Sequence, residues 1–304
     1  MTTSPHDTTR GFALGLLGVA IFALTLPMTR LAVGDAAAPQ LPPVFVTAGR
    51  AALAGLLSIV YLRAVGAAWP LRAHGPALAV CALGTVVGFP LFLALALRKV
   101  DAMHAAVVTG VLPLGTAVAA ALWLRQRASP GFWACALLGC ALVLAFAALA
   151  GGGALSAADG LLLLAVASAS VGYVAGARVS LRLPAEQVIC WVLVLSLPLT
   201  LPVMLATWPA QALAVRPTAW LGFAYVTLFS MWLGFFAWYR ALALGGVMRV
   251  SQVQLLQPFL ALLAAVPLLG ERLDGATVLF ALAVAGVVAL GKRMPVTMRT
   301  TAAR

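Results

Sequence analysis

Residues 131–150 read GFWACALLGCALVLAFAALA and include no charged side chain. A helix of about 20 apolar residues spans the hydrocarbon core of a bilayer, whereas transmembrane β-strands have about 9–11 residues and alternate in polarity. This stretch shows no such alternation. Lipid offers no hydrogen-bond partners to the backbone, so a helix is the structure that satisfies its own polar groups there. Residues 131–150 therefore predict a transmembrane helix.

The composition of the whole chain agrees with this prediction. Of 304 residues, 64% are hydrophobic and 9% are charged, against about 45–50% and about 25% in soluble domains. A water-soluble fold is therefore excluded. The net charge of +12 does not indicate nucleic-acid binding, because the basic residues lie between apolar runs instead of forming one basic face. We expect no metal site or disulfide from the four cysteines, which all lie within apolar runs: Cys81, Cys135, Cys140 and Cys190.

Comparable apolar runs recur along the chain and predict an all-α integral membrane protein with ten transmembrane helices. A Gly151-Gly152-Gly153 linker separates a first five-helix half, 11–150, from a second, 159–291, and residues 1–10 and 292–304 form tails. The predicted spans are 11–33, 43–62, 76–97, 102–124, 131–150, 160–181, 187–207, 218–239, 247–269 and 275–291.

The orientation follows from the excess of Lys and Arg in cytoplasmic loops. With the N-terminus inside, thirteen basic residues are cytoplasmic and five are outside, and Arg50 lies within a span. We therefore expect both tails to be cytoplasmic. The strong preference for arginine over lysine, with lysine only at 99 and 292, is typical of GC-rich bacterial genomes and indicates a bacterial inner membrane.

The two halves resemble each other at a constant offset of 145 residues. This offset pairs Met103 with Met248, Pro113 with Pro258, and Arg127 with Arg272. Because each half has an odd number of spans, the second half must cross the membrane upside down relative to the first. This is the inverted-repeat plan of many transporters.

Several motifs carry a family resemblance, most of them in the second half of the chain. They are Trp232-Leu233-Gly234-Phe235, Trp238-Tyr239-Arg240-Ala241-Leu242, Gly245-Gly246, Gln257-Pro258 and Leu269-Gly270-Glu271-Arg272. In the first half, Pro42-Pro43, Arg50 and Pro113 correspond to them, whereas Gln126 stands where a Glu is usual. The chain thus resembles the EamA-type members of the drug/metabolite transporter superfamily. The resemblance implies ten helices in two inverted five-helix repeats, and transport, often export, of amino acids or related metabolites.

Arg50 is the candidate charged residue of the binding site. It lies about eight residues into the second span, where an arginine costs at least about 2.5–3.5 kcal/mol on insertion scales, so it must face the protein interior. Two roles fit this position. Arg50 either pairs with an anionic group of a substrate or bonds the helix-end carbonyls of a neighbouring helix.

Polar side chains form one stripe on each of two repeat-related helices. On the ninth predicted helix, Ser251, Gln254 and Gln257 share an arc with Pro258, and on the fourth helix Thr109 and Thr116 flank Pro113. We expect both stripes to face one cavity, with Trp238 of the eighth helix beside it. The alternative for each polar residue is a hydrogen bond between helices. The hinge candidates are Pro27, Pro113 and Pro258.

These features predict a transporter, most simply an exporter, that moves a small amphiphilic metabolite by alternating access and needs no cofactor or metal. The expected substrate ligands are Arg50, Thr109, Trp238, Gln254 and Gln257. The three histidines lack a second ligand at helical spacing, and the acidic residues fall at tails or helix ends. A lipid-modifying intramembrane enzyme and a membrane scaffold without transport activity are the alternatives.

Overall fold

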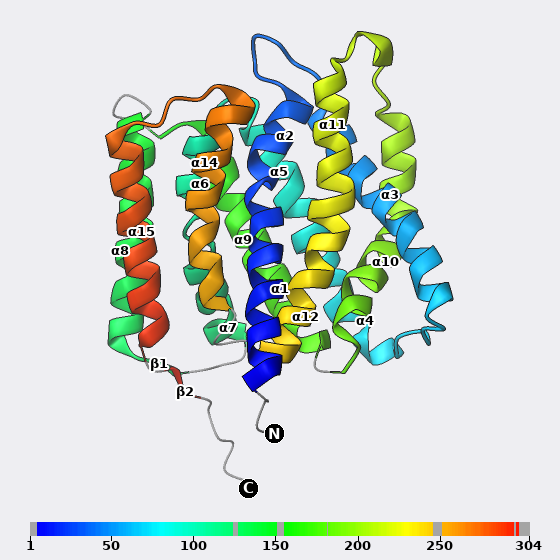
Figure 1. The fold of residues 1–304 in the computed structure, drawn as a ribbon, viewed down its shortest axis with the longest axis horizontal. Helices are drawn as coiled ribbons and strands as arrows, with labels where there is room; N and C mark the ends of the chain where they lie inside the picture. Colours follow the sequence, from blue (N-terminus) through cyan, green and yellow to red (C-terminus); the bar gives the residue numbers. More distant parts are fainter. Residues whose placement is uncertain are drawn as a thin grey trace, which may run out of the picture.

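The protein forms a bundle of roughly antiparallel helices, in which the start of the first helix, α1 (Pro5–Ala23), and the last described strand, β2 (Val296–Thr297), lie at the same end (Figure 1). The computed structural model describes residues 5–123, 127–150, 155–180, 182–245, 251–294 and 296–297. Gln126, Met248, the linker Gly151–Gly153 and the outer parts of both tails lie outside these residues. The predictions made for them therefore stay predictions.

The transmembrane part consists of α-helices interrupted by short segments of other helix types. In chain order the elements are α1 Pro5–Ala23, α2 Thr25–Val33, α3 Pro43–Ala64, η1 Arg72–His74, α4 Gly75–Cys81, η2 Ala82–Gly88, α5 Phe89–Ala96, α6 Ala102–Thr109, α7 Leu112–Trp123, β1 Arg127–Ala128, α8 Pro130–Ala150, α9 Ala157–Ser180, α10 Ala185–Ala206, η3 Ala212–Ala214, α11 Pro217–Tyr225, η4 Val226–Leu233, α12 Gly234–Gly245, η5 Ser251–Leu256, α14 Gln257–Leu269, α15 Gly275–Arg293 and β2 Val296–Thr297. Helices η2 and η4 are π-helices, and η1, η3 and η5 are 3₁₀-helices.

The all-helical membrane fold is confirmed. Within the described residues, eight helical stretches are long and apolar enough to cross a bilayer, and two shorter apolar helices follow at Gln257–Leu269 and Gly275–Gly291. The ninth predicted span is shorter than expected as an α-helix because α14 begins at Gln257, next to Pro258, after the 3₁₀ segment η5. The two-residue strands β1 and β2 pair with each other at the same end of the bundle as the start of α1.

Local sequence explains where the helices begin. Helices α3, α8 and α11 start at Pro43, Pro130 and Pro217, and proline suits a first turn because its missing N–H would have no partner there. Helix α15 is capped by Asp274, whose carboxylate accepts a hydrogen bond from the Thr277 backbone N–H at 2.6 Å.

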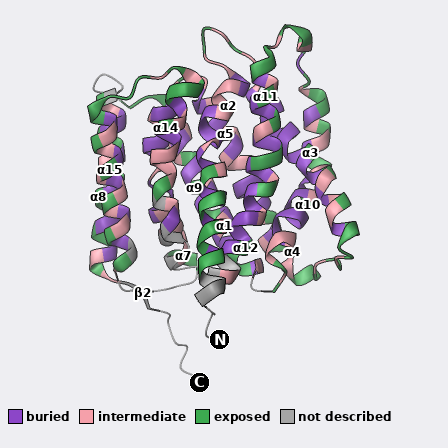
Figure 2. Ribbon diagram, in the orientation of Figure 1, coloured by how far each residue is buried: buried purple, intermediate pink, exposed green. Residues whose placement is uncertain are grey.

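Helices of the first half pack mainly against helices of the second. Helix α3 packs against α10, and α1 and α2 pack against α12 and α11. Helix α9 packs against the stretch formed by α4, η2 and α5, α8 packs against α15, and α6 packs against α14. Buried residues lie between these helices and exposed ones on the outside (Figure 2). Many exposed side chains are large and apolar, such as Leu137 and Leu149, as expected for a surface in contact with lipid.

Candidate functional site

Arg50 lies in the interior of the bundle, as its sequence position predicts. The residue is in α3 and only 3% exposed. Its Nη2 donates a hydrogen bond to the Ser230 hydroxyl at 2.9 Å, and Ser230 is also 2.8 Å from the Thr25 hydroxyl. The Arg50 Nε is buried and has no hydrogen-bond partner among the described residues. Within the part of the chain that the structure describes, Arg50 thus bonds a side-chain hydroxyl and not a helix-end carbonyl.

Arg50 lines a cavity between the helices. We call it the arginine cavity. Its polar wall contains one charged group, the Arg50 guanidinium, together with hydroxyl and amide groups, and the rest of the wall is apolar. The lining residues come from both halves of the chain: Phe22, Thr25, Leu26, Arg50, Thr85, Phe89, Pro90, Leu112, Ala169, Tyr173, Ser230, Met231, Phe235 and Gln257.

Two π-helical segments bring hydroxyl groups to this cavity. Thr85 lies in η2 and Ser230 in η4, and both line the arginine cavity. A π-helical segment widens the helix locally and is found frequently at functional sites. Sequence reasoning gave neither residue a role in binding, since nothing in the local apolar pattern of 76–97 or 218–239 marks a change of helix type.

A second cavity lies beside the first and shares lining residues with it. We call it the amide cavity. The predicted polar residues Thr109, Gln254 and Gln257 line it, and Gln257, Leu26 and Leu112 also line the arginine cavity. The structure therefore brings four of the five predicted ligands to two adjoining cavities. The Ser251 side chain lies outside the described part of the chain.

Trp238 is the fifth predicted ligand, and it lines neither cavity. It is 7% exposed and lies edge-on to Phe22, with the ring centroids 6.5 Å apart. Phe22 in turn forms part of the arginine-cavity wall. Trp238 thus lies behind the wall and not at its surface.

Each of the three predicted hinge prolines lies just after an interruption of its helix. Pro27 follows the break between α1 and α2, Pro113 the break between α6 and α7, and Pro258 the junction of η5 with α14. Proline has no N–H and leaves the carbonyl four residues earlier without its usual partner. For Pro113 and Pro258 these carbonyls belong to Thr109 and Gln254, which line the amide cavity.

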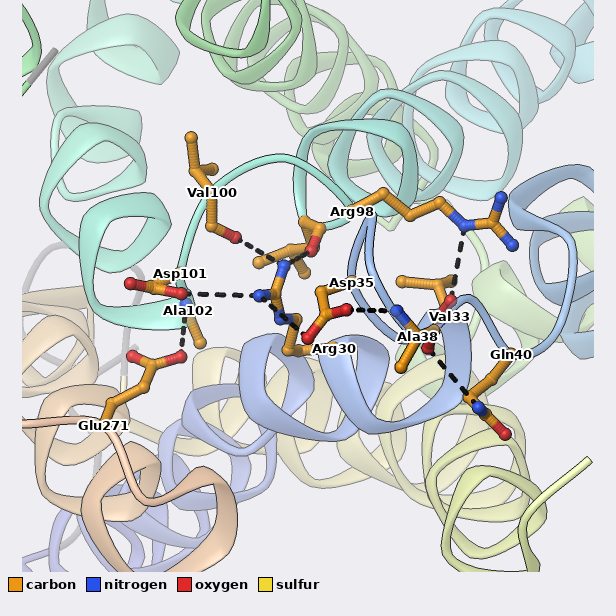
Figure 3. Close-up of polar contacts among 11 residues, drawn as sticks. Arg30, Val33, Asp35, Ala38, Gln40, Arg98, Val100, Asp101, Ala102 and Glu271 are labelled. Atoms are coloured by element: carbon orange, nitrogen blue, oxygen red, sulfur yellow. Dashed lines mark hydrogen bonds and ion pairs between the residues drawn. The ribbon is translucent and has the colours of Figure 1, made fainter.

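Polar contacts join the helices at the end of the bundle opposite the start of α1 (Figure 3). Arg30 donates hydrogen bonds to the carbonyls of Leu97 and Val100 and lies 3.4 Å from the Asp101 carboxylate. Both Glu271 oxygens accept backbone N–H groups at the start of α6, from Ala102 at 2.7 Å and Met103 at 2.8 Å. We call this group of contacts the distal polar cluster.

The pKa of Glu271 is raised above its ordinary value, chiefly because the carboxyl group is partly buried. The hydrogen bonds that the carboxylate accepts from two backbone N–H groups act in the opposite direction. The side chain closes the exposed amino end of a helix, where carboxylates are favourable. Glu271 therefore fastens the end of α14 to the start of α6 across the two halves.

Sequence reasoning also missed the contact between His104 and Asp159. Their Nε2 and Oδ1 atoms are 2.6 Å apart, and Asp159 also accepts hydrogen bonds from the backbone and hydroxyl of Ser156. The Ser-x-x-Asp spacing at 156–159 is a capping-box pattern and signals the helix start, but it does not reveal His104. Neither His104 nor Asp159 lines a described cavity.

The comparisons with known proteins agree with this architecture. The EamA-like transporter family matches residues 9–148 and 156–291. An "uncharacterized transporter YdeK" of Bacillus subtilis (strain 168) is 44% identical over 288 residues, which cover 95% of this chain and 99% of the relative. A protein of known crystal structure has a TM-score of 0.62 at 21% identity and covers 93% of this chain and 96% of its own, which supports the fold alone.

The two family matches account for nearly all of the described chain, including both cavities. The apolar spans make the protein a multi-pass membrane protein. The chain belongs to the EamA-like transporter family, within the drug/metabolite transporter superfamily.

Proposed function

We propose that the protein exports a small amphiphilic metabolite across a bacterial cytoplasmic membrane by alternating access. The observation that carries this proposal is the pair of adjoining cavities, which are built from both halves and lined by Arg50, Thr109, Gln254 and Gln257. Transporters of this kind bind substrate near the midplane, where the halves meet and helices are interrupted. The name of the Bacillus relative supports transport.

The proposal includes ten spans in two inverted five-helix repeats, 11–150 and 159–291. The packing of first-half helices against second-half helices supports it. So does the position of the π-helices, because an offset of 145 carries Thr85 of η2 onto Ser230 of η4. The same offset relates Thr25 to Ser170, both of which are buried.

In this mechanism the distal polar cluster holds one end of the bundle closed. The helix breaks before Pro27, Pro113 and Pro258 allow the halves to rock, so that the cavities open alternately toward either side. Arg50, Thr109, Gln254 and Gln257 contact the substrate. Trp238 supports the cavity wall from behind, through Phe22.

The two alternative functions, an intramembrane enzyme and a membrane scaffold, require different features of the site. An intramembrane enzyme needs a reacting group in a cavity, but the acid–base pair of His104 and Asp159 lines neither of the two described ones. A scaffold has no need of polar cavities lined by both halves.

The direct test combines a growth screen with a transport assay. A strain that overexpresses the protein is grown on toxic amino-acid analogues and drugs, and the compounds to which it becomes resistant are tested in liposomes that contain only the purified protein. We expect flux of at least one compound above that of protein-free liposomes. Resistance without flux in liposomes would contradict the proposal.

We predict that both termini are cytoplasmic, because thirteen basic residues then lie inside and five outside. Reporter fusions after Arg304 and within the Gly151–Gly153 linker measure this orientation, and they should report opposite sides of the membrane. A result that places both on the same side contradicts five spans in each half.

A further prediction concerns Glu271 and energy coupling. Glu271→Gln removes one of two acceptors at the start of α6 and should lower stability by about 1–3 kcal/mol. Thermal unfolding in detergent measures this loss. Flux should persist without an imposed pH gradient, because the described carboxylates lie at helix ends and not at mid-membrane depth.

Glu186→Gln is the matched control, since Glu186 forms an exposed ion pair with Arg240 at 3.2 Å and such pairs contribute about 0–1 kcal/mol. If flux requires a proton gradient and disappears in Glu271→Gln, then Glu271 is part of the coupling machinery and not a structural cap.

A further inference from the structure

Arg50 has no counter-ion among the described residues. Its one recorded side-chain bond goes to the neutral Ser230 hydroxyl. The six acidic side chains that the structure describes are engaged elsewhere, with arginines, with a histidine or with helix starts: Asp35, Asp101, Asp159, Glu186, Glu271 and Asp274. The chain thus holds a cation in its interior and supplies no described anion to neutralise it.

A buried charge without a partner is unfavourable, and buried charges in proteins are normally paired. The unused hydrogen-bonding capacity of Arg50 indicates what the partner is. Nε has no acceptor, and the neighbouring Nη2 bonds a hydroxyl that also lies 2.8 Å from Thr25. Nε and Nη2 lie on one edge of the guanidinium, the edge that binds both oxygens of a carboxylate.

The rest of the arginine cavity indicates the body of the ligand. The aromatic rings of Phe22, Phe89 and Phe235 form part of its wall, together with Leu26 and Met231. This part of the wall offers apolar contacts to the body of a ligand. Among the described residues no acidic side chain lines either cavity, so the described lining carries a single positive charge and favours a ligand with one negative charge.

We propose that Arg50 binds the carboxylate of an organic monoanion with an apolar body, and that this anion is the substrate class of the transporter. The statement that this anion is a substrate rests on the proposed transport function, but the binding of the anion at Arg50 can be tested by itself. On binding, the two carboxylate oxygens accept hydrogen bonds from the Nε–H and an Nη2–H of Arg50, and the apolar body lies against the phenylalanine side chains.

The first experiment compares charge at constant shape in the purified wild-type protein. Isothermal titration calorimetry in detergent measures the affinity for 3-phenylpropanoate, for its neutral amide and for chloride. We expect the carboxylate to bind about 10- to 100-fold more tightly than the amide. The neutral amide cannot form the hydrogen bonds between charged groups that join the Arg50 guanidinium to a carboxylate. Equal affinity for acid and amide overturns the proposal, and so does chloride competing as strongly as the carboxylate.

The second experiment uses variants of one helix. Arg50→Gln should lose the preference for the carboxylate over the amide, and Arg50→Lys should bind the carboxylate more weakly than wild type, because lysine lacks the two-pronged edge. Arg63→Gln is the matched control, since Arg63 is an exposed residue in the last turn of α3. Size-exclusion chromatography reports the folded fraction of each variant.

If Arg50→Gln does not fold, the wild-type comparison of acid with amide and the binding by Arg50→Lys decide the question. A folded Arg50→Gln that still prefers the carboxylate contradicts the proposal. If another compound is transported and its flux is unchanged in Arg50→Gln, carboxylates are not the substrate class, but the proposed transport function still holds. If carboxylates bind at Arg50 but no compound shows flux in liposomes, the proposed transport function is wrong and the proposed binding site still holds.

Discussion

Gln254→Leu should weaken the apparent affinity for the transported compound by about 5- to 150-fold. The substitution keeps similar bulk but removes the amide, which lines the amide cavity from η5. A lost hydrogen bond to a ligand, with the partner left unsatisfied, costs about 1–3 kcal/mol, and 1.4 kcal/mol is tenfold in affinity. The concentration dependence of flux in proteoliposomes measures the change.

Gln187→Leu is the control for this prediction. It makes the same substitution in the first turn of α10, at a residue that lines neither described cavity, and it should leave the affinity nearly unchanged. If Gln254→Leu transports with normal affinity, Gln254 is not a ligand. If it loses folded yield instead, the amide serves as a hydrogen bond between helices.

Gly84→Ala should destabilise the protein by about 1–3 kcal/mol or more. Gly84 in η2 faces α9, and an added methyl group would lie 2.7 Å from the Gly172 Cα atom and also meet the Ser168 carbonyl oxygen. Backbone atoms cannot move aside as a side chain does, so the two helices must separate, and overpacking of this kind is costly. The neighbouring Thr85 would then be displaced from the arginine cavity.

Gly286→Ala is the matched control, because a methyl group at Gly286 in α15 meets no atom within 4 Å. Alanine favours a helix over glycine by about 0.5–1 kcal/mol, so this variant should be as stable as wild type or slightly more stable. The apparent melting temperature in detergent compares the two. Equal stability of both variants would show that α9 and η2 do not pack as closely as described.

Much of the candidate site could be predicted from local sequence. Thr109 and Gln254 share a repeat offset, and each lies four residues before a proline, so their place beside an interrupted helix follows from spacing alone. The burial of Arg50 also follows from its depth in an apolar run. The position of Trp238 could not be predicted, because the π-helical segment η4 precedes it and changes the rotation that regular α-helical spacing assumes.

The sequence by itself determined the membrane-spanning, all-helical class and the placement of the polar residues within spans. Both depend on the hydrophobicity and length of continuous segments, which are local properties. Only the tertiary structure decided which polar groups meet. Arg50 and Ser230 are 180 residues apart, and His104 and Asp159 are 55 apart. Whether they meet depends on how each helix is rotated and how closely the helices pack at small residues such as Gly84 and Gly172. Lipid-facing and protein-facing sides of a transmembrane helix are similarly apolar, so no local pattern specifies that rotation.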